Sequence, residues 1–295
     1  MDEILQWGLE FVYAVQTARG PVLDGVFKAI TYLLEKETLV ILLSFVYWCV
    51  DGTMGLRLSV AYLLGGYANE LLKDWWQQPR PFHVDPSVQL IEQGGYGLPS
   101  THSTGSVLLP GIIAARVRRG WVWMVAITVA VLVGLSRVYL GVHYPTDVLA
   151  GWTMGAIYLL IYLGWGSRLE TWLKAARLPV QMALGAGVPL VLALLHPTYY
   201  TIAFMSPLVG IGLGVPLAAR VAPASTAGPF WQRALRFLVG VVPLVAIFFG
   251  LAALFPGEGE AFYDVLRGVR YGLVGVWVGL GAPWLFLRLK LASRR

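Results

Sequence analysis

The sequence has a single cysteine, few charged residues and no evident internal repeat. Cys49 is the only cysteine in 295 residues, which excludes both an intrachain disulfide and a cysteine-based zinc site. Charged residues make up 13% of the chain and hydrophobic residues 57%, whereas a soluble domain has ~25% charged residues. The long uncharged runs argue against an apolar soluble enzyme and indicate a polytopic membrane protein.

Apolar segments of helical length follow one another along the chain and predict an all-α transmembrane bundle. The first segment is short for a span, which normally needs ~20 residues, so we expect about nine spans. The segments cover residues 37–50, 56–72, 103–117, 121–140, 146–165, 179–195, 200–219, 234–255 and 265–287.

The chain is expected to have three regions. Residues 1–36 mix apolar and charged positions around Gly20-Pro21 and predict one or two amphipathic helices at the membrane surface. Residues 37–178 form a transmembrane core that carries the polar motifs and ends in an interfacial helix at 167–178. Residues 179–295 add further transmembrane helices of unassigned role, for which a homodimer surface, a lipid groove and simple bulk all remain open.

Three short polar stretches interrupt this apolar pattern, and the first is Lys73-Asp-Trp-Trp-Gln-Gln-Pro-Arg80-Pro81. It ends an apolar segment just past two tryptophans, whose rings fit the headgroup level. Basic residues at a helix end can simply extend toward water. With the other two stretches present, we interpret Lys73 and Arg80 as a clamp on a phosphate group.

The second stretch is Pro99-Ser100-Thr101-His102, which directly precedes an apolar segment. Ser100 is a suitable N-cap, and a helix start presents free N–H groups that bind anions. His102 would then lie where a leaving-group oxygen can take its proton. A simple helix cap explains the serine but does not explain a histidine in the first turn of a membrane helix.

The third stretch begins at Ser136-Arg137 and ends at His143-Tyr-Pro-Thr-Asp147. Arg137 supplies a third cation for the phosphate. Pro145 suits the first position of the next helix, which places His143 and Asp147 four residues apart across a helix start, within reach of a hydrogen bond. Asp147 could also be only a first-turn acid favoured by the helix dipole.

Together these residues resemble the three signatures of the type 2 phosphatidic acid phosphatase (PAP2) superfamily: K-x6-RP, PSGH and SR-x5-H-x3-D. The first and third match at every specified position. The second has Thr101 in place of glycine, which restricts the backbone more. Pro-Ser-Thr-His resembles the sphingosine-phosphate phosphatase branch, and the preceding Tyr96-Gly97-Leu98 resembles the dolichyl pyrophosphate phosphatases.

The resemblance implies a six-helix catalytic core, to which this chain adds C-terminal transmembrane helices. It also implies an integral membrane lipid phosphatase that needs no metal or other cofactor. It implies that His143 attacks phosphorus and forms a phosphohistidine, that Asp147 orients His143, and that His102 protonates the leaving alcohol. The residues expected to hold the phosphate are Lys73, Arg80, Ser100, Thr101 and Arg137. The substrates it implies are phosphatidate, phosphatidylglycerophosphate, sphingoid-base phosphate or polyprenyl diphosphate.

Other functions are compatible with the same residues. A phosphohistidine can pass its phosphoryl group to another lipid, which would make the protein a phosphotransferase. A lipid transporter or scramblase on the same scaffold would not need the histidines. A binding protein for phosphorylated lipids would need only the cations.

The charge pattern predicts orientation rather than nucleic-acid binding, because the basic residues behind the net charge of +6 are dispersed between apolar runs. With the polar motifs placed on one side of the membrane, 14 of the 22 basic residues fall on the other side. Positive loops face the cytoplasm. We therefore expect a protein of the inner or plasma membrane with its site on the extracytoplasmic side.

Overall fold

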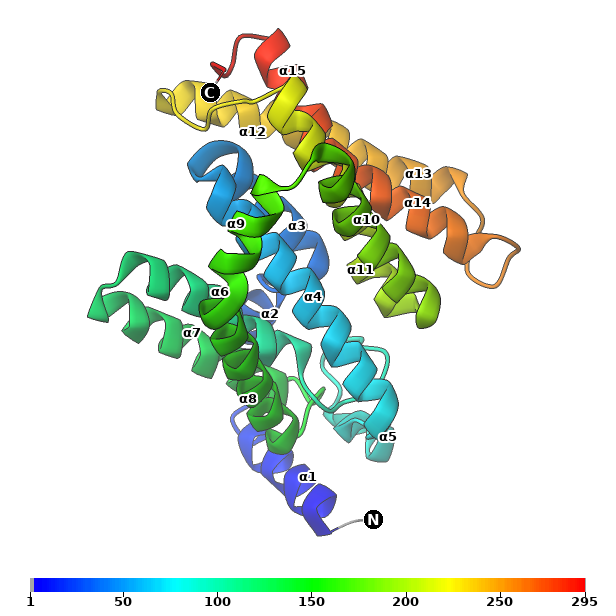
Figure 1. Cartoon of the computed structure of the whole chain (residues 1–295). Helices are drawn as coiled ribbons and strands as arrows, with labels where there is room; N and C mark the ends of the chain where they lie inside the picture. Colours follow the sequence, from blue (N-terminus) through cyan, green and yellow to red (C-terminus); the bar gives the residue numbers. More distant parts are fainter. Residues whose placement is uncertain (1–2, 295) are drawn as a thin grey trace. The chain divides into compact units, whose positions relative to one another are not determined.

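The computed structural model describes residues 3–294, whose regular elements are helices, which confirms the predicted all-α class (Figure 1). An isolated antiparallel bridge between Ala224 and Arg294 is the one extended pairing in this part of the chain. The helices are α1 (Glu3–Gln16), α2 (Pro21–Tyr32), α3 (Lys36–Phe45), α4 (Gly52–Trp76), α5 (Pro81–Val84), α6 (Thr101–Val117), α7 (Gly120–Tyr139), α8 (Pro145–Ile161), α9 (Ser167–Ala175), α10 (Leu178–Leu195), α11 (Tyr199–Val221), α12 (Phe230–Val245), α13 (Leu251–Leu254), α14 (Tyr263–Val276) and α15 (Ala282–Arg288).

Several of these helices continue into π-helical turns, which lengthen them toward the thickness of a bilayer. The turns cover Val46–Val50, Tyr162–Gly166, Ala246–Gly250 and Trp277–Gly281. Within residues 3–294, six helices are long and apolar enough to cross a membrane, and the last two and the second include such turns: Gly120–Tyr139, Pro145–Ala175, Leu178–Leu195, Tyr199–Val221, Phe230–Leu254 and Tyr263–Arg288. The protein is therefore an integral membrane protein.

The nine predicted apolar segments all fall on helices, to within a terminal residue. Three of them, 37–50, 56–72 and 103–117, lie outside the six candidate spans. The third of these belongs to α6, which is only 17 residues long. The predicted surface helices are also present as α1, α2 and α9; their place at the membrane interface stays a prediction.

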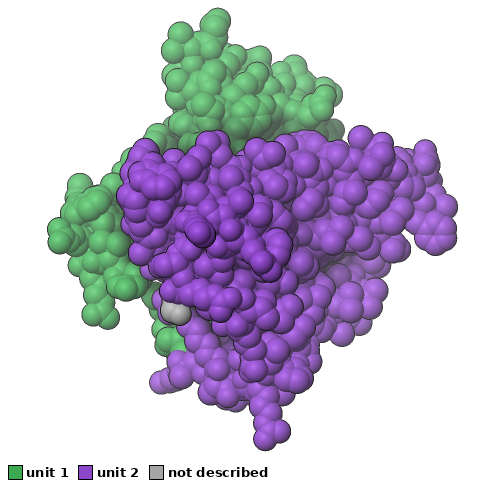
Figure 2. Space-filling model, turned by 90° about the horizontal axis from the view of Figure 1, so that it is seen from above, with its two compact units in different colours: residues 1–39, 68–167 green, residues 40–67, 168–295 purple. Residues whose placement is uncertain are grey.

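The chain divides into two compact units, which Figure 2 colours green and purple. Residues 1–39 and 68–167 form the first unit, and residues 40–67 and 168–295 form the second. Helix α4 contributes its last turns to the first unit, and with them Lys73. Every residue predicted for the phosphate site lies in this first unit. The three-region division at residues 36 and 178 stays a prediction.

In the first unit, α6 packs against α7 and α8, and α1 and α2 pack against α7. Two glycines allow α8 to approach α6 closely: a Cβ on Gly151 would lie 2.5 Å from the carbonyl oxygen of Ser100, and one on Gly155 would lie 2.7 Å from that of Thr104. Small residues permit this kind of backbone approach between membrane helices. The first turns of α6 and α8, which carry the second and third motifs, are held together in this way.

A buried apolar cluster packs around the third motif. It joins α1, the segment after Arg80 and the stretch around His143, and its residues are Leu9, Val12, Phe82, Val88, Val138, Tyr139, Leu140, Val142, Tyr144 and Val148. Close packing of this kind holds a polar loop in one conformation. The backbone on either side of His143 is therefore fixed by the core.

The second unit has its own packing. Helix α11 packs against α10 and α14. A core forms around Trp48, whose indole N–H donates to the carbonyl oxygen of Val278 at 3.0 Å. Arg57 and Glu170 form an ion pair at 2.8 Å in the same unit.

Candidate functional site

The three polar stretches come together in the first unit. Each side chain stands at a helix end or in the loop next to one. Lys73 is in the last turn of α4, Arg80 precedes α5, Ser100 caps α6, Thr101 and His102 open α6, Arg137 is in the last turn of α7, His143 is in the loop before α8, and Asp147 is in the first turn of α8.

His143 and Asp147 form the hydrogen bond that their spacing predicts. The Nδ1 atom of His143 lies 3.0 Å from Oδ2 of Asp147, and both side chains are buried. The same Oδ2 accepts the backbone N–H of Tyr144 at 3.0 Å, and Oδ1 accepts the side-chain amide of Gln78 at 2.5 Å. Three donors therefore fix the carboxylate, and the carboxylate fixes the imidazole.

Arg80 determines which tautomer of His143 is present. Its Nη1 lies 2.9 Å from Nε2 of His143. A guanidinium has only donors, so Nε2 must accept and Nδ1 must carry the proton that is donated to Asp147. The rest of the guanidinium is held by backbone: Nε donates to Gly95 at 2.9 Å, Nη1 to Val142 at 2.8 Å and Nη2 to Gly94 at 3.0 Å.

The charges around His143 keep it neutral. Burial, followed by the positive charges of Arg80, Arg137 and Lys73, lowers the pKa of His143 well below its ordinary value. A neutral ring with its proton on Nδ1 has its lone pair on Nε2, which is the form of histidine that acts as a nucleophile.

Arg137 is completely buried at the end of α7. Its Nη1 donates to the hydroxyl of Thr31, and its Nη2 donates to the side-chain oxygen of Gln93 at 2.7 Å. Its Nε–H is buried and has no hydrogen-bond partner among the described residues. A buried donor of this kind normally has an acceptor, and a phosphate oxygen is a suitable one.

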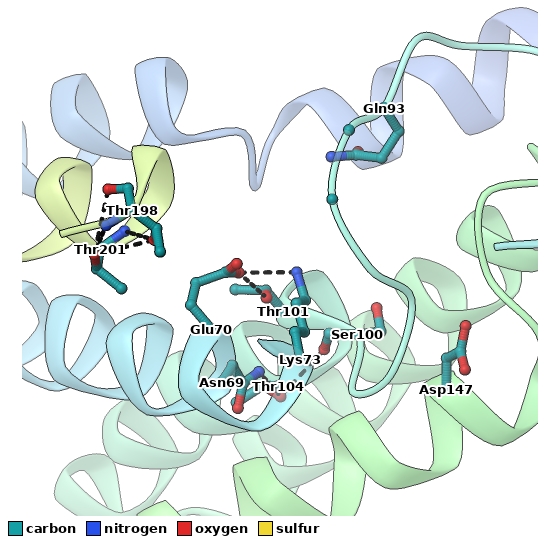
Figure 3. A network of polar contacts seen from close by, with 12 residues as sticks. Asn69, Glu70, Lys73, Gln93, Ser100, Thr101, Thr104, Asp147, Thr198 and Thr201 are labelled. Carbon is teal, nitrogen blue, oxygen red and sulfur yellow. Dashed lines mark hydrogen bonds and ion pairs between the residues drawn. The ribbon is translucent and has the colours of Figure 1, made fainter. Parts of the chain in front are cut away.

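Lys73 lies beside an acid that the sequence analysis missed (Figure 3). Its Nζ is 2.8 Å from Oε1 of Glu70, one helical turn earlier, and both side chains are buried. The hydroxyl of Thr101 donates to the same oxygen at 3.4 Å. Charges three residues apart on a helix meet readily, so this spacing could have revealed Glu70.

Ser100 is the predicted N-cap of α6. Its Oγ accepts the backbone N–H of Ser103 at 3.3 Å and the hydroxyl of Ser103 at 3.0 Å. The backbone N–H of Ser100 donates to the carbonyl oxygen of Asp147 at 3.0 Å. This bond connects the second motif directly to the third.

His102 faces an acid from the N-terminal region. Its Nε2 lies 3.3 Å from Oε1 of Glu35, a residue in the short connection between α2 and α3. Burial alone would raise the pKa of Glu35, but the contact with His102 and the charge of Arg137 lower it overall. Glu35 is therefore an anion at neutral pH. No sequence motif marks it.

Two further polar residues of the first motif region serve the loop structure. The Nδ1 atom of His83 accepts the backbone N–H of Arg80 at 3.2 Å. Asp85 accepts the hydroxyl of Tyr13 at 2.6 Å and the backbone N–H of Ser87 at 2.9 Å. Residues 3–294 contain no group of three or more His, Cys, Asp or Glu side chains arranged to hold a metal ion.

Comparison with known families gives two matches that together cover most of the chain. Residues 54–170 match the PAP2 superfamily, and residues 202–294 match the transmembrane extension of PAP2 superfamily phosphatases. The first match contains all three polar motifs. The second accounts for much of the region beyond residue 178.

Curated relatives of the chain are lipid phosphatases. Phosphatidylglycerophosphatase B of Bacillus subtilis is 28% identical over 52% of this chain and 79% of its own length. Undecaprenyl-diphosphatase of Sulfolobus acidocaldarius is 37% identical over 35% of this chain, and sphingosine-1-phosphate phosphatase 2 of Mus musculus is 30% identical over 59% of it. The chain spans about half the length of these last two relatives, 50% and 52%.

A solved structure is also similar. The crystal structure of a transmembrane PAP2-type phosphatidylglycerolphosphate phosphatase from Bacillus subtilis matches with a TM-score of 0.48 and 27% identity, over 57% of this chain and 88% of the other. The family matches and the phosphatase relatives lead to one conclusion: the chain belongs to the PAP2 superfamily and is a membrane-embedded phosphate-ester hydrolase.

Proposed function

We propose that the protein removes a terminal phosphate from a membrane lipid through a covalent phosphohistidine on His143. The observation that carries the proposal is the arrangement around this ring. Asp147 holds the proton on Nδ1, Arg80 faces Nε2, and Arg137 and Lys73 add positive charge. A neutral imidazole nucleophile among cations suits attack on a dianionic phosphate.

The first step forms the phosphohistidine. The lone pair on Nε2 of His143 attacks phosphorus, the bond from phosphorus to the lipid oxygen breaks, and His102 gives that oxygen a proton. Arg80 must release Nε2 for this attack, and the incoming phosphate oxygens become its new acceptors. Arg137 and Lys73 stabilise the equatorial oxygens as charge shifts in the transition state.

The second step returns the enzyme to its starting state. His102, now neutral, takes a proton from water while the water oxygen attacks phosphorus. The bond from phosphorus to Nε2 breaks, and inorganic phosphate leaves. Throughout, Asp147 accepts the hydrogen bond of Nδ1–H and offsets the positive charge that the phosphorylated ring carries.

We propose as substrate a lipid whose tail stays in the bilayer. The named relatives act on a phosphatidylglycerophosphate, an undecaprenyl diphosphate and a sphingosine phosphate. All three carry a terminal phosphate on a long apolar chain. Phosphatidate, phosphatidylglycerophosphate, sphingoid-base phosphates and polyprenyl diphosphates are therefore the candidates.

Hydrolysis is expected to survive metal chelation, because three cationic side chains take the charge-neutralising role that metal ions have in many phosphoryl transfers. The measurement is phosphate release in detergent, with and without EDTA, from a panel of these four lipids. Phosphatidylglycerol, a diester without a terminal phosphate, is the matched negative control. The order of rates would name the substrate class.

Three results would contradict this proposal. Activity that EDTA removes and Mg²⁺ restores would contradict metal independence. No release from any lipid would favour the transport or binding function. If the lipid substrate carries a radioactive phosphate and that phosphate is transferred to added diacylglycerol instead of being released, the phosphotransferase function would be favoured.

We further propose that the site faces the extracytoplasmic side, since most basic loop residues fall on the opposite side. In a Cys49→Ser background, Glu92→Cys would lie in the exposed loop between α5 and α6 on the side of the site. Arg119→Cys would lie in the exposed connection between α6 and α7 on the other side. A membrane-impermeant thiol reagent on intact cells is expected to label only the first variant; labelling of only the second would reverse the assignment.

A further inference from the structure

Positive charges surround His102, the general acid of the proposed mechanism, and disfavour its protonated form. His102 must carry a proton that it can give to the leaving oxygen. The charged and titratable groups that face it include Arg137 from the end of α7, Lys73 from the end of α4 and His143 from the loop before α8. Positive neighbours oppose a second positive charge on the ring. The cations that bind the phosphate thus work against the acid that must act on it.

Besides Asp147, two carboxylates lie near this group of cations, and of these two Glu35 is the one in contact with His102. Glu70 lies 2.8 Å from Lys73 and also accepts the hydroxyl of Thr101. Glu35 lies 3.3 Å from Nε2 of His102. The side chain of His102 is 12% exposed and that of Glu35 is 30% exposed. The contact is therefore only partly screened by solvent, and a carboxylate there favours the protonated ring.

We propose that Glu35 is the positioning residue of the general acid, so that the site contains two carboxylate–histidine pairs with opposite roles. Asp147 keeps the nucleophile in one tautomer, and the charge of Glu35 favours the protonated ring of His102 against burial and the neighbouring cations. Glu35 lies outside residues 54–170, which match the superfamily, so the N-terminal region would contribute directly to the reaction. The inference rests on the proposed function.

The test compares leaving groups. An alkyl lipid phosphate needs a proton on its departing oxygen, whereas p-nitrophenyl phosphate releases a stable anion and needs little help. Glu35→Gln is expected to lower kcat on the lipid by about 10²-fold, at the lower end of what general acid catalysis contributes. On p-nitrophenyl phosphate the rate is expected to stay within about threefold of the wild type. KM for the lipid should not rise, because the change removes a negative charge near the phosphate cations.

The pH profile is a second readout that a purely structural role would not change. The reaction needs protonated His102, so activity falls as pH rises through the pKa of that ring. Loss of the carboxylate weakens proton binding. The alkaline limb of kcat on the lipid is therefore expected at lower pH in Glu35→Gln than in the wild type.

Glu37→Gln is the matched control. It makes the same chemical change two residues away, at a half-buried glutamate that contacts Lys36 at 3.8 Å, and should behave as the wild type. An equal loss on both substrates in Glu35→Gln, or no loss on the lipid, would overturn the inference. His143→Ala, assayed alongside, separates the two failures. If it keeps its activity, the phosphohistidine mechanism falls; if it is inactive while Glu35→Gln resembles Glu37→Gln, only the role of Glu35 falls.

Discussion

His143→Ala is expected to abolish hydrolysis, with a loss of about 10⁴-fold or more, as is typical when the nucleophile of a covalent mechanism is removed. Water cannot replace the ring without a base, and the nearest carboxylate, that of Asp147, is buried and still accepts hydrogen bonds from Tyr144 and Gln78. The measurement is the initial rate of phosphate release from the best lipid of the panel. Acid-labile, base-stable phosphoprotein, trapped by rapid denaturation, should appear in the wild type and be absent from the variant.

A second histidine change controls for general damage. His196→Ala lies in the second unit, where the backbone oxygen of this residue accepts the hydroxyl of Thr201. His196 belongs to none of the three motifs, so a rate close to that of the wild type is expected. If His143→Ala kept more than about a tenth of the activity, the nucleophile would have to be sought elsewhere. A lipid-flip activity that survives His143→Ala would favour the transporter instead.

The fold was largely predictable because its signals are local. A run of apolar residues has one stable state in a bilayer, the helix, since each backbone group must find its partner within the segment. This requirement fixed the helices from residue 37 onward. What the sequence could not reveal is the grouping into two compact units, in which α4 contributes to both. That grouping depends on contacts between segments far apart in the chain.

Part of the candidate site was predictable for the same reason. Ser100 caps α6, and Pro145 begins α8, because both are local helix-start signals. The hydrogen bond between His143 and Asp147 follows from a spacing of four residues across that helix start. Each of these features depends on neighbours within a single turn of helix.

The partners that come from elsewhere in the chain were not predictable. Glu35, Gln93 and Thr31 reach His102 and Arg137 from segments that carry no motif. Arg80 shows the physical limit most clearly. It was expected to hold phosphate, but much of its guanidinium is bound by carbonyl oxygens of the loop at residues 94–95 and of residue 142. Backbone acceptors can belong to any residue type, so no sequence pattern identifies them.

Asp147→Asn is expected to lower kcat by about 10⁴-fold while the fold is kept, the loss found when a buried aspartate that orients a histidine becomes an amide. The amide has nearly the same shape. Its oxygen can still accept from Tyr144, and Gln78 can rotate to present its own oxygen. What it cannot supply is negative charge beside the ring. The phosphorylated imidazole, which is positive, therefore loses its stabilisation.

Because Arg80 faces Nε2 of His143, Asp147→Asn can also disturb the tautomer of this histidine. The opposite orientation of the asparagine, in which the NH₂ faces Nδ1 of His143 and the Tyr144 contact is lost, would move the ring proton to Nε2, which faces the N–H of Arg80 at 2.9 Å. Two donors would then oppose each other, and the lone pair needed for attack would be lost. Gln78→Ala, which removes only the partner of Oδ1, is expected to lower kcat by less than about tenfold. If Asp147→Asn were no worse than Gln78→Ala, the carboxylate would act only as a structural acceptor, and its charge would have no part in the reaction.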